Sequence, residues 1–143
     1  LGAYPTYAEE GRATLSKLTG RSDILAVPAP RMRKDRTYAS ALALKAWLDA
    51  DGNGPKRYNL ISSNAHTRRS WRLFEAALGS EYEIGALAIR PVSYDPEHWW
   101  AYSEGFKAVT GETVAYLYTL LIFPFTGERL PETVDSLAPP RAF

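Results

Sequence analysis

Cysteine is absent from this 143-residue chain, and histidine occurs only twice. Without cysteine there is no disulfide bond, no thiolate nucleophile and no thiolate-ligated zinc. Two histidines would leave carboxylates to complete any zinc site, which is an unusual ligand set. The composition therefore predicts no metal centre, and no pattern in the chain identifies a cofactor.

The chain also lacks an excess of one charge and a long apolar run. Its 17 basic and 16 acidic residues give a net charge of +1, whereas a large basic excess is typical of proteins that coat nucleic acids. The longest apolar tract, Leu120–Phe125, is far shorter than the roughly 20 residues that cross a bilayer. We therefore expect a soluble chain without a nucleic-acid partner, and any membrane association through a segment outside it.

Helical and strand patterns alternate along the sequence. Thr6 and Glu9 have the spacing of a capping box that opens a helix running to about Leu18, with Gly20 as its stop. Further helices are expected around Tyr38–Leu48, from about Thr67 to Leu78 and across Phe106–Leu120, and short apolar strands at Ile24–Val27, Tyr58–Ile61 and Glu83–Ile89. This alternation predicts an α/β fold, a Rossmann-like open parallel sheet of three strands with helices on both faces.

The domain organisation follows from the same pattern. Residues 1–125 are expected to form one α/β domain, and the proline-rich residues 126–143 an extended tail. Three strands leave sheet edges with unpaired backbone groups. We therefore expect a preceding segment or a second chain to complete the sheet.

The junction between the second predicted strand and the next helix is the strongest candidate site. The apolar run ends at Ser62, Ser63 and Asn64, and the helical pattern follows after a tight loop. The first N–H groups of a helix have no partner within it and favour an anion, so the junction predicts a phosphate-binding site. The alternative is that these three residues only cap the helix, since they are preferred caps anywhere.

Three side chains near this junction are candidates for chemistry. His66 is a general acid or base near neutral pH, or a structural hydrogen-bonding group. Arg68 and Arg69 lie about 100° apart on a helix, so only one is expected to face the site. We favour Arg69 as the phosphate ligand.

The remaining candidates lie in the loops after the first and third predicted strands. Strand ends in a parallel sheet share one edge, so the loops Ala29–Arg36 and Arg90–Trp100 are expected beside Ser62–Arg69. Asp35 is a base or magnesium ligand, although a helix cap is the favoured interpretation. Trp99 and Trp100 would form a base-stacking or lipid-contacting lid, or they would pack the loop against the domain. For at least one of the two, packing is the favoured interpretation.

Three segments resemble one known family. Lys34–Ala41, Ile61–Ser70, and Tyr94–Trp100 with Ser103–Gly105 are similar to the ElyC/SanA/YdcF family of bacterial α/β proteins. The family's His-x-x-Arg pattern falls on His66 and Arg69, and its helix-opening threonine on Thr37. The resemblance covers the C-terminal portion of the family's domain, since the opening strands with their glycine-rich turn have no counterpart here.

The resemblance implies a role in the bacterial cell envelope, with the protein in the cytoplasm or associated with the inner membrane. One hypothesis is a transferase or phosphoester hydrolase that acts on a lipid-carrier phosphate or nucleotide-like metabolite. The alternative is a non-catalytic module that binds a nucleotide or S-adenosylmethionine and regulates envelope assembly. The predicted catalytic residues are His66 and Asp35, and the predicted ligand-binding residues are Thr37, Ser62, Ser63, Asn64, Arg69 and Trp99.

Overall fold

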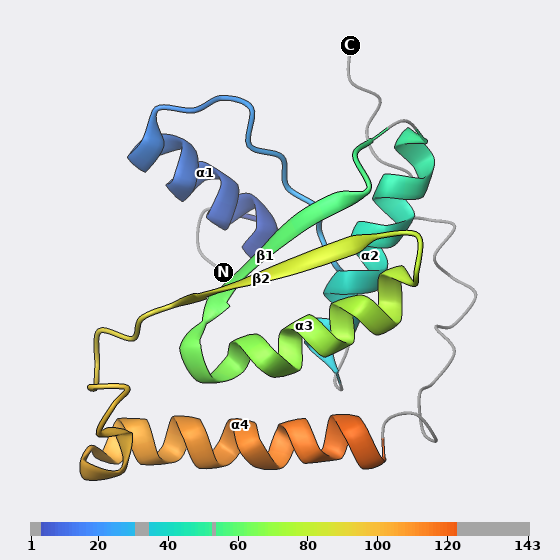
Figure 1. Ribbon diagram of the computed structural model, residues 1–143. Coiled ribbons are helices and arrows are strands. Elements are labelled where there is room, and N and C mark those ends of the chain that lie inside the picture. The colour runs from blue at the N-terminus through green and yellow to red at the C-terminus, as the bar shows by residue number, and fades with distance from the viewer. Residues whose placement is uncertain (1–3, 31–34, 53, 123–143) are drawn as a thin grey trace. The chain divides into compact units, whose positions relative to one another are not determined.

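The computed structural model describes residues 4–30, 35–52 and 54–122 (Figure 1). The elements are, in order, α1 (Tyr7–Thr19), α2 (Arg36–Asp51), β1 (Arg57–Ser63), α3 (Asn64–Leu78), β2 (Glu83–Ile89), the 3-10 turn η1 (Trp99–Ala101) and α4 (Ser103–Leu121). The predicted tail at residues 126–143 lies outside the described residues. The contacts of the chain define two compact units, Leu1–Tyr58 with Leu73–Ile84, and Asn59–Arg72 with Gly85–Phe143. The prediction of one domain over residues 1–125 stays a prediction.

Strands β1 and β2 form a two-stranded parallel sheet, and α3 connects them, which confirms the α/β class (Figure 1). The backbone N–H of Glu83 donates to the carbonyl of Lys56 at 2.8 Å, so the two strands start in register. In a parallel pair the carboxyl ends of both strands lie at the same edge. The segments that follow Ser63 and Ile89 therefore start from one edge, as predicted for two of the three loops.

The prediction of a third strand at Ile24–Val27 is wrong. These residues are described but form no strand, and Leu25 is 67% exposed, although a short apolar strand was expected. Pro28 and Pro30 follow at once, and proline has no N–H to donate to a sheet. A short apolar run becomes a strand only when a neighbouring strand pairs with it, and no local signal supplies that neighbour.

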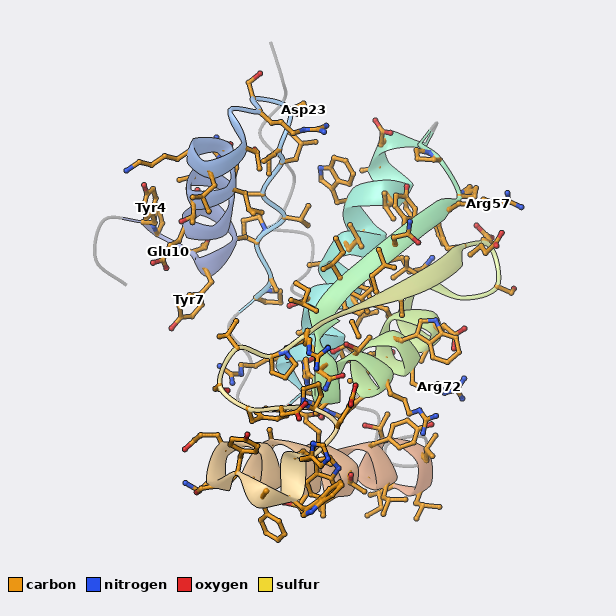
Figure 2. The ribbon with its side chains drawn as sticks, turned by 60° about the vertical axis from the view of Figure 1, so that its left-hand side comes forward. Tyr4, Tyr7, Glu10, Asp23, Arg57 and Arg72 are labelled. Carbon is orange, nitrogen blue, oxygen red and sulfur yellow. The ribbon has the colours of Figure 1, made fainter. Side chains whose placement is uncertain are left out.

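The first unit contains a small apolar core beside a polar surface helix. Ala41 and Leu48 of α2 pack with Ala77, Leu78 and Tyr82 at the end of α3 and the start of the following loop. Helix α1, by contrast, has no buried residue, and Figure 2 shows Tyr7 and Glu10 projecting from it. The predicted capping box is confirmed, because the backbone N–H of Glu9 donates to Thr6 and the Glu9 carboxylate accepts from the Thr6 N–H.

In the second unit, the covered side of α4 does not follow its large apolar residues. Phe106, Leu117 and Leu120 are exposed, and the covered side runs through Gly105, Val109, Glu112, Tyr116 and Thr119. The helix is apolar on most of its circumference, so the 3.6-residue period does not select one face. None of the described helices is long and apolar enough to cross a bilayer.

Candidate functional site

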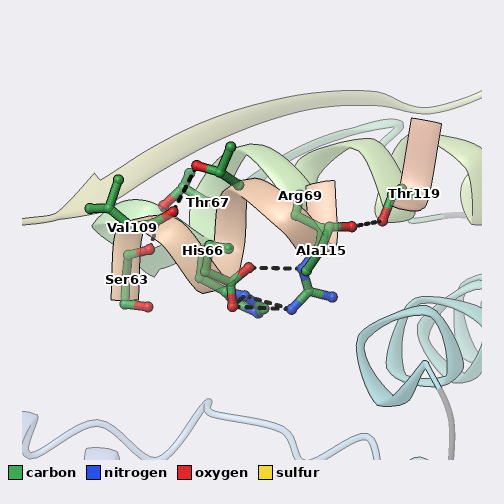
Figure 3. Close-up of polar contacts among 9 residues, drawn as sticks. Ser63, His66, Thr67, Arg69, Val109, Ala115 and Thr119 are labelled. Atoms are coloured by element: carbon green, nitrogen blue, oxygen red, sulfur yellow. Dashed lines mark hydrogen bonds and ion pairs between the residues drawn. The ribbon is translucent and has the colours of Figure 1, made fainter. Parts of the chain in front are cut away.

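The strand runs directly into the helix at the predicted site, without the tight loop expected from the sequence. Ser62 and Ser63 are the last residues of β1, and Asn64 is the first residue of α3. The Thr67 hydroxyl donates to the Ser63 carbonyl at 3.0 Å and so ties the first helical turn to the strand end (Figure 3). The hydroxyl of Ser63 lies on an exposed residue, while Ser62 and Asn64 are half-buried. Ligand binding by these three residues stays a prediction.

His66 and Arg69 lie on one side of α3 and meet the same carboxylate. Their spacing of three residues places both side chains on one helix face. Arg69 Nε donates to Glu112 Oε2 at 2.8 Å, and Arg69 Nη2 donates to Glu112 Oε1 at 3.3 Å. His66 Nδ1 lies 3.0 Å from Glu112 Oε1. Figure 3 labels His66 and Arg69 and marks the hydrogen bonds and ion pairs of both side chains with dashed lines.

The tautomer of His66 decides what this contact does. Nδ1 lies 3.0 Å from both Glu112 Oε1 and Arg69 Nη2, and one nitrogen cannot donate to the first and accept from the second. Arg69 is already bonded twice to Glu112, so the arrangement that satisfies all three groups has Nδ1–H donating to the carboxylate. In that tautomer Nε2 carries the lone pair and is the atom available for proton transfer or ligand contact.

The electrostatics of the cluster are those of a partly buried ion pair. Burial raises the pKa of Glu112, but the hydrogen bonds from Arg69 and His66 outweigh this effect, and the net pKa lies below its ordinary value of 4.5. The side chains of Glu112 and Arg69 are 25% and 17% exposed. The charges of Arg69 and Glu112 neutralise each other. A phosphate bound to Arg69 would therefore share the guanidinium with Glu112 or displace the Glu112 carboxylate from it.

Arg68 has a different environment from Arg69, as expected for neighbours on a helix. It is exposed, and its guanidinium carbon lies 5.6 Å from the centre of the Tyr116 ring, which is a cation–π distance. Arg68 therefore provides a matched comparison for Arg69, because it has the same charge and lies on the same helix.

Asp35 and Thr37 lie at the start of α2, in the first unit. Asp35 is at the cap position with a φ of 49°, but its carboxylate accepts no capping hydrogen bond from the first turn of α2, so the favoured cap interpretation lacks its bond. Thr37 is half-buried in the first turn of the helix. The catalytic role of Asp35 and the ligand-binding role of Thr37 stay predictions.

Trp99 is the tryptophan that packs in the loop before α4. Its ring centre lies 6.3 Å from that of Phe106 and 5.9 Å from that of Trp100. Trp99 is half-buried, whereas Trp100 is exposed. Packing therefore accounts for the position of Trp99, and its predicted ligand contact stays a prediction.

Sequence reasoning missed Glu112, the residue that joins His66 and Arg69. A signal was present, because Glu112 is the lone charged residue between Lys107 and Glu128. An acid in an otherwise uncharged helical stretch needs a partner when it is partly buried. The His-x-x-Arg pattern at His66 and Arg69 supplies two side chains that can bond such an acid.

No group of three or more His, Asp or Glu side chains within the described parts of the chain could hold a metal ion. Comparisons of the chain with family models, with curated proteins and with solved structures found no match.

Proposed function

We propose that this chain is a Rossmann-like protein of the ElyC/SanA/YdcF type that binds and processes a phosphorylated metabolite of the bacterial cell envelope. The ligand is a lipid-carrier phosphate or a nucleotide-like molecule, bound beyond the carboxyl edge of the sheet. A preceding segment or a second chain supplies further strands, and the protein acts in the cytoplasm or at the inner membrane. The observation that carries the proposal is the contact of His66 and Arg69 with one carboxylate, Glu112.

The geometry supports a proton-transfer role for His66. A carboxylate bonded to one ring nitrogen fixes the tautomer and stabilises the imidazolium that forms when the other nitrogen takes a proton. Here Glu112 is bonded to Nδ1, at 3.0 Å. Nε2 then accepts the proton of the nucleophile, which is water in a hydrolase or a substrate hydroxyl in a transferase, as that nucleophile attacks phosphorus.

Arg69 is the group that would hold the phosphoryl oxygens. A guanidinium has five N–H donors, and the two hydrogen bonds to Glu112 use only two of them. The remaining donors suit a bidentate contact with phosphate. Glu112 would then position both cationic partners while phosphate binds on their other side.

The second candidate is a binding module that takes up a nucleotide or S-adenosylmethionine without turnover and regulates envelope assembly. The observation that favours it is the charge balance of the site. Glu112 already neutralises Arg69, and such a pair can serve only to hold α3 against α4. In this case His66 would be a hydrogen-bonding group without a chemical step.

Turnover and affinity measured on one set of variants separate the two candidates. The intact protein is assayed for turnover of polyprenyl phosphates and sugar nucleotides, and for binding of the same ligands. Arg69→Ala should weaken binding by about 10- to 150-fold, since a charge-assisted hydrogen bond contributes roughly 1.5–3 kcal/mol. Arg69→Lys should restore part of the loss, and the control Arg68→Ala should leave affinity near that of the wild type.

His66→Ala distinguishes an enzyme from a binder. In an enzyme it should reduce turnover more than affinity, and in a binding module it should change affinity alone. Thermal stability is measured for each variant, so that a loss of folding is not taken for a loss of binding. If Arg69→Ala binds every ligand as tightly as Arg68→Ala, the cluster is a structural link between α3 and α4, and the phosphate site is wrong.

A further inference from the structure

The loop between β2 and α4 is held in shape by its own hydrogen bonds, although it has little regular structure. The Glu97 N–H donates to Asp95 Oδ1 at 3.1 Å, and the His98 N–H donates to the Asp95 carbonyl at 3.2 Å. The Ala101 N–H donates to the His98 carbonyl at 2.9 Å. These bonds fix the backbone on which the side chains of residues 98–100 stand.

Trp99 anchors this loop to α4. A Cβ at Gly105 would lie 2.5 Å from the carbonyl oxygen of Trp99 and 2.9 Å from the Tyr94 ring, so only glycine permits this approach. The Trp99 ring packs against Phe106 at 6.3 Å. The loop therefore uses one tryptophan for packing and does not need the second one for that purpose.

Trp100 is fixed in orientation and yet exposed. Its ring makes edge contacts with Trp99 at 5.9 Å and 84°, and with His98 at 5.6 Å and 67°. It remains 60% exposed. A rigid aromatic face open to solvent loses little conformational entropy when a planar ligand stacks on it.

His98, which contacts this ring, and Arg90 meet at one carboxylate, that of Asp95. His98 Nδ1 lies 2.8 Å from Asp95 Oδ2, which fixes the tautomer that presents Nε2 as an acceptor. Arg90 Nη2 lies 3.4 Å from Asp95 Oδ1, a weak contact from a largely exposed side chain. The surface thus combines an aromatic face, an oriented imidazole and a guanidinium that one weak bond leaves largely available.

We propose that Trp100, His98 and Arg90 form a nucleotide-binding site, in which the base stacks on Trp100, a base N–H donates to His98 Nε2 and Arg90 contacts the phosphate. Asp95 is a positioning residue that orients His98 and Arg90. The proposal does not rest on the phosphate role of His66 and Arg69. A free nucleotide and the nucleotide part of a sugar nucleotide share this chemistry.

Other ligands use only part of this surface. A neutral sugar would stack on Trp100 but would leave Arg90 without a role, and inorganic phosphate would contact Arg90 but not the ring. A nucleotide uses both, because its planar base and its phosphate are separated by a sugar. Base stacking on an aromatic side chain is also tolerant of base identity, so more than one nucleotide should bind.

The experiment compares AMP, UMP, adenosine, ribose 5-phosphate and inorganic phosphate by calorimetric titration of the full chain, with the Trp100 indole N–H resonance followed by NMR. AMP and UMP should bind and shift this resonance, adenosine should bind more weakly, and ribose 5-phosphate and phosphate should leave it unmoved. Trp100→Ala should weaken AMP binding by about 5- to 150-fold, and Trp100→Phe by much less. Tyr7→Ala, which removes an exposed aromatic residue from α1, is the matched control and should bind AMP like the wild type.

Two further variants test the other contacts and separate this site from the proposed phosphate site. Arg90→Ala should weaken AMP binding but not adenosine binding, and Arg69→Ala should leave both unchanged at this site. The proposal is overturned if Trp100→Ala binds AMP as tightly as Tyr7→Ala does, or if no nucleotide shifts the Trp100 resonance. If Trp100→Ala binds inorganic phosphate like the wild type and Arg69→Ala does not bind it, the proposed function is supported independently of the nucleotide site.

Discussion

Replacing Glu112 by glutamine is the most direct test of the cluster that joins α3 to α4. The amide has nearly the shape of the carboxylate but carries no charge. It leaves Arg69, whose side chain is only 17% exposed, without its ionic partner. The variant therefore measures how much the charge of Glu112 contributes to stability.

The size of the effect follows from the contacts and their exposure. Glu112 accepts two hydrogen bonds from Arg69, at 2.8 and 3.3 Å, and lies 3.0 Å from His66 Nδ1. A charge-assisted hydrogen bond contributes roughly 1.5–3 kcal/mol, and breaking a fully buried pair costs about 3–5 kcal/mol. The cluster is partly exposed and its bonds are not additive, so we expect a loss of about 2 kcal/mol in the free energy of unfolding.

The loss should depend on pH in one direction. The pKa of Glu112 in the folded protein lies below its ordinary value of 4.5. A carboxylate with a lowered pKa stabilises the fold fully above its unfolded pKa, and this contribution disappears as the pH falls through the folded value. The difference between wild type and Glu112→Gln should therefore be full at neutral pH, shrink below pH 4.5 and vanish in stronger acid.

Urea unfolding across this pH range, followed by circular dichroism, measures the effect. The control is Glu104→Gln on the same helix, because Glu104 is exposed and lies 3.8 Å from an equally exposed Lys107. Its stability should change by no more than about 0.5 kcal/mol. Inorganic phosphate should raise the melting temperature of Glu112→Gln more than that of the wild type, because the internal carboxylate no longer competes for Arg69. If Glu112→Gln is as stable as Glu104→Gln at neutral pH, the reasoning about the cluster is wrong.

Three further pairs of substitutions test other contacts. Gly105→Ala should destabilise the protein by about 1–3 kcal/mol, because the new methyl group would lie 2.5 Å from a backbone oxygen. Gly111→Ala, which meets nothing within 4 Å, should instead stabilise α4 by about 0.5–1 kcal/mol in the same thermal unfolding experiment. Ser70→Ala should be neutral or stabilising by up to about 1 kcal/mol, since the buried Ser70 hydroxyl has no hydrogen-bond partner among the described residues. Thr67→Val, which loses the hydrogen bond to the Ser63 carbonyl, should be destabilising. If Ser70→Ala were the more destabilising of the two, Ser70 would have a hydrogen-bond partner. Tyr82→Phe should raise the pKa of Asp49 toward its ordinary value of 3.8, because the hydrogen bond from Tyr82 is the main cause of the lowered pKa. NMR titration of Asp49 measures this shift. An equal shift in Tyr58→Phe would contradict the assigned cause.

Features encoded by neighbouring residues were predictable from the sequence. The capping box of Thr6 and Glu9 and the glycine stop at Gly20 lie where the pattern placed them, because each depends on bonds within four residues. The same holds for His66 and Arg69, whose spacing places them on one helix face. The alternation of helices and strands likewise indicated the α/β class.

Features that depend on distant contacts were decided only by the tertiary structure. Ile24–Val27 has the composition of a strand but pairs with no strand among the described residues, and α4 is apolar on most sides, so neither burial nor pairing is encoded locally. Glu112 lies 43 residues beyond Arg69 in the chain, and which of Trp99 and Trp100 is exposed depends on the packing around Gly105. Local hydrogen bonds form within a few residues of the chain. A long-range contact, by contrast, exists only where two surfaces pack together, and the two residues in contact do not specify that packing by themselves.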